Sequence, residues 1–71
     1  MAPTQVRNEI RRLRFEHGEM TQGDLAGRIG LTRQTVNAIE QGKYSPTLEA
    51  AFRIARVFGR PLEEVFRYDG D

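Results

Sequence analysis

Hydrophobic residues along this chain recur three or four positions apart in short stretches, and glycines separate one stretch from the next. This spacing is typical of short amphipathic helices that bury one side. In the first stretch, over about residues 4–16, Val6, Ile10 and Leu13 form one such stripe. The sequence has no clean alternation of apolar and polar positions, which would indicate a strand. We therefore expect an all-α fold built from five short helices, with residues 67–71 frayed.

Capping residues mark the ends of the second and third predicted helices. Thr21 and Asp24 fit a capping box, in which each side chain bonds to the backbone of the other residue. Gly30 stands where a left-handed residue would end the second helix, and Thr32 is a good N-cap for the third. Gly42 then ends the third helix, so two short helices follow each other almost without a loop.

The fourth predicted helix runs to about Phe58, and its start is open between two residues. Either Ser45 caps this helix with Pro46 at the first helical position, or Thr47 caps it. The fifth helix is short and begins near Pro61. Its apolar residues are Leu62, Val65 and Phe66.

Residues 21–42 form the most informative segment, because two short helices meet there through a tight turn at residues 30–31. Such a turn makes the two helices cross steeply. At 100° per residue, Val36 and Ile39 define the buried side of the third helix. The opposite side presents Gln34, Asn37, Ala38 and Gln41, with Arg33 on its flank. Gln and Asn can pair with adenine, and Arg with guanine, so this side is typical of a helix that reads the major groove.

These residues resemble the Xre/Cro-type helix-turn-helix regulators, which include the lambdoid phage repressors. The resemblance covers about residues 6–66, and the stretch LTRQTVNAIEQGKYSPTLEAAFRIARVFGRPLEEVF is similar to short stand-alone members of that family. It implies a lambda-repressor-like bundle of five helices whose third helix reads double-stranded DNA.

The resemblance also implies roles for single residues. Base-reading positions fall on Arg33, Gln34, Asn37 and Ala38. Positions that contact the DNA backbone fall on Gln22, Gln41, Lys43, Tyr44 and Ser45, and the glutamine also braces the reading helix. Arg14 and Glu40 match a pair that forms an internal salt bridge in some phage repressors; the alternative is a weak pair on the surface. Gly23 and Gly27 stand where longer side chains are usual.

Several of these side chains have a second interpretation. Arg33 alone is as consistent with a solvated arginine as with a base reader. Tyr44 either stacks within its loop or donates to a phosphate. Arg11 and Arg12 either contact phosphate or simply lie on the solvent-exposed side of the first helix.

Charge is almost balanced, with 11 Lys and Arg against 10 Asp and Glu and a net charge of +1. A histone-like binder would carry a strong positive excess, so DNA affinity here must come from local placement of charge. Residues 1–43 hold seven basic and five acidic side chains, a net charge of +2, while residues 44–71 hold four and five, a net charge of −1. The part that contains the helix-turn-helix pattern is therefore the more positive one.

Composition excludes several function classes. The chain has no cysteine and only one histidine, so disulfides, zinc fingers and thiolate catalysis are excluded, and we expect no metal and no cofactor. It has neither an apolar run of membrane length nor a signal peptide. We expect one cytoplasmic, nucleoid-associated domain over residues 1–71, with an ordered core at about 4–66, that is not an enzyme.

The sequence thus predicts a transcriptional regulator, with repression the natural role, that binds double-stranded DNA as a homodimer on a pseudo-palindromic operator. A thin core and an apolar last helix favour dimerisation. The candidate dimer contacts are Leu62, Val65 and Phe66. The alternative is an antitoxin-like or accessory module that binds a protein partner and for which DNA binding is secondary.

Overall fold

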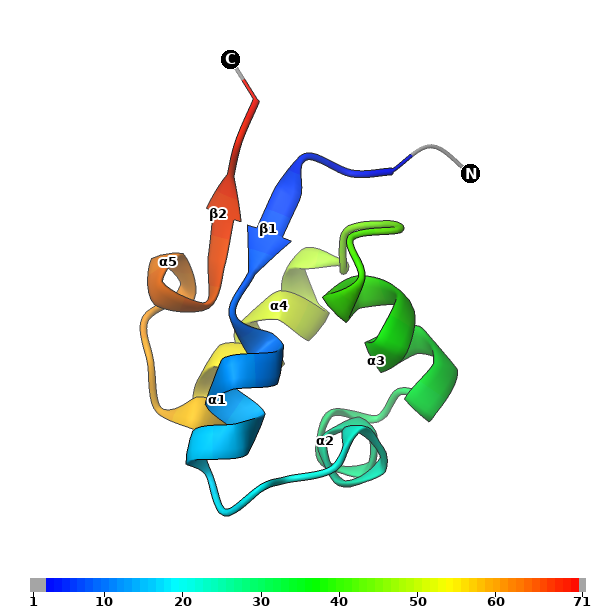
Figure 1. Ribbon diagram of the computed structural model, residues 1–71, viewed down its shortest axis with the longest axis vertical. Coiled ribbons are helices and arrows are strands. Elements are labelled where there is room, and N and C mark those ends of the chain that lie inside the picture. The colour runs from blue at the N-terminus through cyan, green and yellow to red at the C-terminus, as the bar shows by residue number, and fades with distance from the viewer. Residues whose placement is uncertain (1–2, 71) are drawn as a thin grey trace.

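The computed structural model describes residues 3–70 and contains, within that range, five helices and one small sheet (Figure 1). The helices are α1 (Ile10–Glu16), α2 (Gln22–Ile29), α3 (Arg33–Glu40), α4 (Leu48–Phe58) and α5 (Leu62–Val65). The strands are β1 (Val6–Asn8) and β2 (Phe66–Tyr68). The predicted lambda-repressor-like arrangement of five helices is confirmed, and a two-stranded sheet is added to it.

The sheet corrects two predictions made for the ends of the chain. β1 pairs antiparallel with β2, and Val6 lies opposite Tyr68. The first helix therefore begins at Ile10 and not near residue 4. Residues 66–68 form a strand, so the predicted fraying is wrong for 67 and 68, and Phe66 lies on β2 rather than on the fifth helix. Residue 71, also predicted to be frayed, lies outside the described residues.

Asn8 explains why the chain changes from strand to helix where it does. Its side-chain oxygen accepts a hydrogen bond from the backbone N–H of Ile10 at 3.1 Å. This bond satisfies one of the N–H groups that the first turn of a helix leaves without an intrahelical partner. The Asn8 amide nitrogen donates to the carbonyl oxygen of Ile39 at 2.9 Å, so the same side chain joins β1 to the last turn of α3.

The predicted caps of α2 and α3 are confirmed. Thr21 and Asp24 form the complete capping box, and the Thr32 hydroxyl accepts from the backbone of α3. Gly30 ends α2 with φ +76°, a left-handed conformation that side chains with a Cβ rarely adopt. Of the two alternatives for α4, the structure has Thr47 as the cap, with its hydroxyl accepting from the backbone N–H of residue 50 at 3.1 Å.

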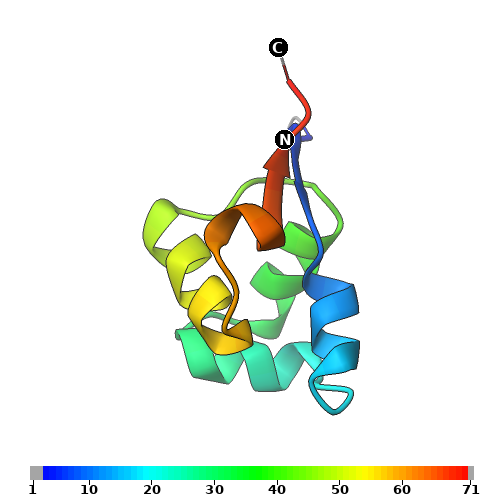
Figure 2. The same cartoon turned by 90° about the vertical axis from the view of Figure 1, so that its left-hand side faces the viewer.

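One hydrophobic core joins all five helices. In Figure 1, α4 lies between α5 on one side and α3 on the other, and in the view of Figure 2 it lies at the left-hand edge of the molecule, with α1 at the right-hand edge. The two described chain ends lie together at the end of the molecule opposite α2. The largest fully buried side chains are Ile10, Leu13, Leu25, Val36, Ile39, Ile54 and Val65. This core holds the buried side of α3 and leaves its other side in solvent.

Candidate nucleic-acid interface

The outer side of α3 presents the residues that helical spacing placed there. Arg33 and Gln34 are exposed in its first turn, and Gln41 is exposed just after its end. Asn37 and Ala38 are half-buried between them. The first turn of α3 contains no acidic residue. The N-terminal end of this helix therefore offers long polar side chains and a positive helix dipole to an approaching anion.

A side chain from α2 braces the middle of α3. Gln22 donates from its amide nitrogen to the side-chain oxygen of Asn37 at 3.0 Å and to the Glu40 carboxylate at 3.3 Å. Gln41 donates to the same Asn37 oxygen at 3.3 Å. Bidentate pairing with adenine uses both the oxygen and the nitrogen of an asparagine amide. The Asn37 oxygen is thus bonded twice, whereas its amide nitrogen has no hydrogen-bond partner within residues 3–70.

An ion pair fixes α1 against α3. Arg14 donates to the two carboxylate oxygens of Glu40 at 2.6 and 3.0 Å, and it also donates to the carbonyl oxygen of Met20 at 2.8 Å. The side chains are only 16% and 7% exposed, so the partly buried clamp is the arrangement present, and not the weak surface pair. Glu40 would otherwise place an uncompensated negative charge close to the outer side of α3.

The loop after α3 adds three more of the predicted positions. Lys43 and Ser45 are exposed, whereas Tyr44 is half-buried and packs against the hydrophobic core. The backbone N–H of Lys43 donates to the carbonyl oxygen of Ala38 at 3.0 Å, which keeps the start of the loop against the end of α3. The packing of the Tyr44 ring on the core anchors the loop beside this interface.

Comparison with known proteins places this geometry in a family. The helix-turn-helix family profile matches residues 10–65. The chain belongs to the Xre/lambda-repressor-like helix-turn-helix family. It therefore carries a helix-turn-helix DNA-binding domain, in which α2 and α3 are the two motif helices. The second helix of such a motif is called the recognition helix, and we use this name for α3.

Individual relatives agree with this membership. The chain is 46% identical over 66 residues to an uncharacterized HTH-type transcriptional regulator of Methanocaldococcus jannaschii. The alignment covers 93% of this chain and 98% of the relative. It is 36% identical over 58 residues to the transcriptional repressor of the cryptic phage CTXphi of Vibrio cholerae, covering 82% of this chain and 51% of the repressor. A crystal structure of a candidate DNA-binding protein from Bacteroides fragilis has a TM-score of 0.76 at 19% identity, over 87% of this chain and 98% of that chain, and shows the shared fold.

Cations without an acidic partner are the second feature of this helix-turn-helix domain. Within residues 3–70, six arginines lie within 4.0 Å of a carboxylate. The basic residues without such a partner in that range are Arg11, Arg28, Arg33, Lys43 and Arg56. Arg33 and Lys43 stand at opposite ends of the recognition helix, so its surface keeps positive charge that no internal pair neutralises.

Asn8 is a residue that the sequence did not single out. Its bond to the Ile39 carbonyl holds the last turn of the recognition helix from outside the motif. The one available signal was its position two residues before the first helical residue, where asparagine side chains commonly bond to the backbone two residues on.

Among the described residues, no helix is long and apolar enough to cross a bilayer, and no group of three or more His, Cys, Asp or Glu side chains could hold a metal ion.

Proposed function

We propose that this chain is a sequence-specific regulator of transcription that binds double-stranded DNA as a homodimer on a pseudo-palindromic operator, in the cytoplasm with the nucleoid. The observation that carries the proposal is the outer side of α3. It presents Arg33 and Gln34 at its N-terminal end. The Arg14–Glu40 pair joins the helix to α1, and Gln22 joins it to α2. The N-terminal end of α3, to which we assign base reading, is thus exposed, whereas Gln22 and the Arg14–Glu40 pair hold the middle and the last turn of the helix.

The reading positions divide by chemistry. Gln34 can form a bidentate pair with adenine, and Arg33 can do so with guanine. Asn37 contributes its amide nitrogen, because its oxygen is bonded within the protein. Ala38 offers only a methyl group, which suits an apolar contact with a thymine methyl.

Contacts to the sugar-phosphate backbone set the register of the domain on DNA. The residues that we assign to this role are Gln22, Gln41, Lys43, Tyr44 and Ser45. Lys43 supplies a full positive charge next to the end of α3, and Gln41, Tyr44 and Ser45 supply neutral donors. Both amide hydrogens of Gln22 are already donated to Asn37 and Glu40, so the donor that we assign to it is its backbone N–H at the first position of α2. These residues flank the recognition helix. Gln22 lies at the start of α2, and the other four lie between the end of α3 and the start of α4.

Selection of bound duplexes from a random double-stranded pool, at near-physiological salt, tests the proposal. We expect enrichment of a two-fold symmetric site whose half-sites lie about one helical turn, roughly 34–36 Å, apart. Lys43→Ala should weaken binding to all sequences alike and flatten the salt dependence of affinity. Absence of any duplex binding at low salt would overturn the proposal.

The dimer surface that we propose lies on the side of α5 and β2. Leu62 and Phe66 are half-buried and, together with Val6, line two adjoining shallow apolar grooves; Leu48, at the start of α4, lines one of them and is 66% exposed. Val65, the third residue expected there from the sequence, is 0% exposed within the core and is left out of this surface.

Leu48→Glu tests the dimer surface. An acidic residue at the first position of a helix suits the helix dipole, so the monomer should keep its fold. We expect this variant to sediment as a monomer at concentrations where the wild-type chain is a dimer. Phe15→Glu is the matched control, since Phe15 is 68% exposed on a different side of the molecule. Equal sedimentation of the Leu48 variant and the wild type would contradict this surface.

A second candidate function is an antitoxin-like or accessory module that binds another protein. The observation that favours it is the same apolar surface, which would suit the partner chain as well as it suits a second copy. Stoichiometric co-purification of one partner, with no affinity for DNA at low salt, would support this candidate over the first.

A further inference from the structure

Three arginines of α1 point to two different sides of the molecule. Arg14 reaches α3 through Glu40. Counted at 100° per residue, Arg11 lies only 60° around the helix from Arg14, whereas Arg12 lies 160° from it. Arg12 accordingly donates to Glu9 and Glu16, each at 3.1 Å, away from α3. Arg11 and Arg12, although neighbours in sequence, thus lie 100° apart around the helix, and Arg11 is the one on the side of Arg14.

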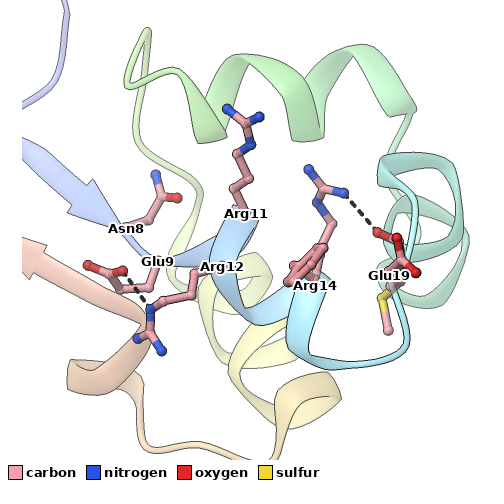
Figure 3. A pocket seen from close by; sticks show the side chains of 8 residues that line it. Asn8, Glu9, Arg11, Arg12, Arg14 and Glu19 are labelled. Carbon is pink, nitrogen blue, oxygen red and sulfur yellow. Dashed lines mark hydrogen bonds and ion pairs between the residues drawn. The ribbon is translucent and has the colours of Figure 1, made fainter.

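Arg11 stands beside the last turn of the recognition helix. In Figure 3 its guanidinium extends from α1 towards α3, in the space between Asn8 and Arg14. Both of these neighbours bond to that turn, Asn8 to the carbonyl oxygen of Ile39 and Arg14 to the carboxylate of Glu40. Arg11 therefore projects next to the end of α3 without bonding to it.

The environment of Arg11 leaves its charge uncompensated. The side chain is exposed, and no carboxylate within residues 3–70 lies within ion-pair distance of it. It lines an open groove along α1, whose other lining residues include Arg12, Phe15 and Glu19. Glu9, which also lines the groove, is paired with Arg12, and Glu19 lies at the far end beyond Arg14 (Figure 3). The part of the groove nearest α3 is therefore positive.

We infer that Arg11 binds a DNA phosphate outside the helix-turn-helix motif and extends the interface onto α1. This inference rests on the proposed function, since it assumes that α3 lies in the major groove. Duplex DNA carries one negative charge for about every 1.7 Å of axis, so phosphates continue past the end of a docked helix. A guanidinium suits them because it donates two parallel hydrogen bonds to phosphate oxygens. Arg11 is then a positioning residue on the side of α3 that the motif itself does not cover.

The salt dependence of DNA affinity tests the inference. The probe is the duplex enriched in the selection experiment or, if nothing is enriched, the random duplex pool. Each neutralised phosphate contributes about 0.9 to the slope of log affinity against log salt. Arg11→Ala should therefore lower that slope by about 0.9. The ratio of wild-type to variant affinity should accordingly shrink about 3.5-fold between roughly 50 and 200 mM salt.

Arg12→Ala is the matched control, one residue further along the same helix. It removes an arginine that lies 100° around the helix from Arg11 and is already paired with two carboxylates, so any loss of folding stability should be larger in this variant than in Arg11→Ala. Its salt slope should equal that of the wild type. Arg11→Lys, which keeps the charge, should retain most of the slope.

The outcomes separate the two proposals. If the wild type binds duplex DNA and the Arg11→Ala slope equals the wild-type slope, Arg11 does not contact phosphate, and the inference is wrong while the proposed function stands. Equal reductions in the Arg11 and Arg12 variants would also overturn it, because a general loss of charge would then explain both. If the wild type binds no duplex at any salt concentration, the proposed function fails and the inference fails with it.

Discussion

Replacing the Arg14–Glu40 pair by methionines, singly and together, tests how α3 is held. The three variants are Arg14→Met, Glu40→Met and the double variant. Methionine is unbranched and uncharged; it matches the length of a glutamate side chain and is shorter than an arginine side chain. The single variants each leave one charged group in a partly buried place without its partner, whereas the double variant leaves none.

The structure sets the expected size of these effects. Removing one partner of a buried ion pair costs about 3–5 kcal/mol, because the other charge stays desolvated. The Arg14 side chain is 16% exposed, and Gln22 still donates to Glu40 in its absence, so we expect the lower end, about 3 kcal/mol, for Arg14→Met. A domain of this length has a total stability of about 4–11 kcal/mol, so this loss is a large share of it.

The double variant should lose less free energy than either single one. Apolar groups of similar volume often replace a buried ion pair at little or no loss, so we expect a coupling energy of about 2–3 kcal/mol between the two positions. Urea unfolding followed by far-ultraviolet circular dichroism measures it. In thermal unfolding, each 1 kcal/mol corresponds to about 4–8 °C in Tm for a domain of this size.

An exposed pair provides the control for this double-mutant cycle. Glu49 and Arg53 on α4 also form an ion pair, at 2.8 Å, but their side chains are 76% and 54% exposed. The same methionine cycle on this pair should give a coupling of about 0.5 kcal/mol or less. If the Arg14–Glu40 cycle is additive to within about 0.5 kcal/mol as well, the pair does not fix α1 to α3, and the argument from its burial is refuted.

Three further predictions concern α2, the start of α1 and the reading of bases. Gly27→Ala should stabilise the domain by about 1 kcal/mol in urea unfolding, because a Cβ there meets no atom within 4 Å. Gly30→Ala should destabilise it by about 1–2 kcal/mol, because residue 30 has φ +76°. A change of the same sign in both variants would contradict the helix geometry. A hydrogen bond from Arg12 holds the pKa of Glu9 below its ordinary value of 4.5, so this carboxylate stabilises the fold above that pH and its contribution falls as the pH drops through the lowered value. Arg12→Ala should raise the Glu9 pKa in a carboxyl-carbon NMR titration, and an unchanged pKa would exclude the hydrogen bond as its cause. Gln34→Ala should cost about 1–3 kcal/mol on the selected operator and relax specificity at one position per half-site, and wild-type affinity and specificity in this variant would exclude Gln34 as a base reader.

The sequence predicted those features that depend on residues close together along the chain. The capping box at Thr21 and Asp24 and the left-handed Gly30 follow from residue types within one helical turn. The outer side of α3 follows from the 100° rotation per residue, once Val36 and Ile39 are known to face the core. Each of these depends on contacts within a few positions along the chain.

The sheet could not be predicted in this way. Its strands have three residues each, too few to show an alternating pattern. Val6 also lies four positions before Ile10, the spacing of a helical stripe, so periodicity assigned it to the helix. What makes it a strand residue is its pairing with Tyr68 at the other end of the described chain.

The candidate site shows the same division. Periodicity places Asn37 on the outer side of α3 but does not show that Gln22, on another helix, bonds to its oxygen. The Arg14–Glu40 pair came from a family resemblance rather than from spacing, because its members are 26 positions apart. Contacts between helices depend on the tertiary fold, and a single sequence carries no local signal for them.

The antiparallel pair β1–β2 closes the described chain into a loop, because it joins residues 62 positions apart. The two strands are short, and all of their residues are half-buried or exposed, so few buried contacts hold the pair together. Local opening of this pair therefore requires less free energy than opening of the core. β1 ends with Asn8, which bonds to the last turn of α3, so an opening of the sheet that leaves the bundle folded can remove this bond while the Arg14–Glu40 pair still holds the turn. In the DNA complex proposed above, the end of α3 near Gln41 would then have one restraint fewer when it settles against the duplex.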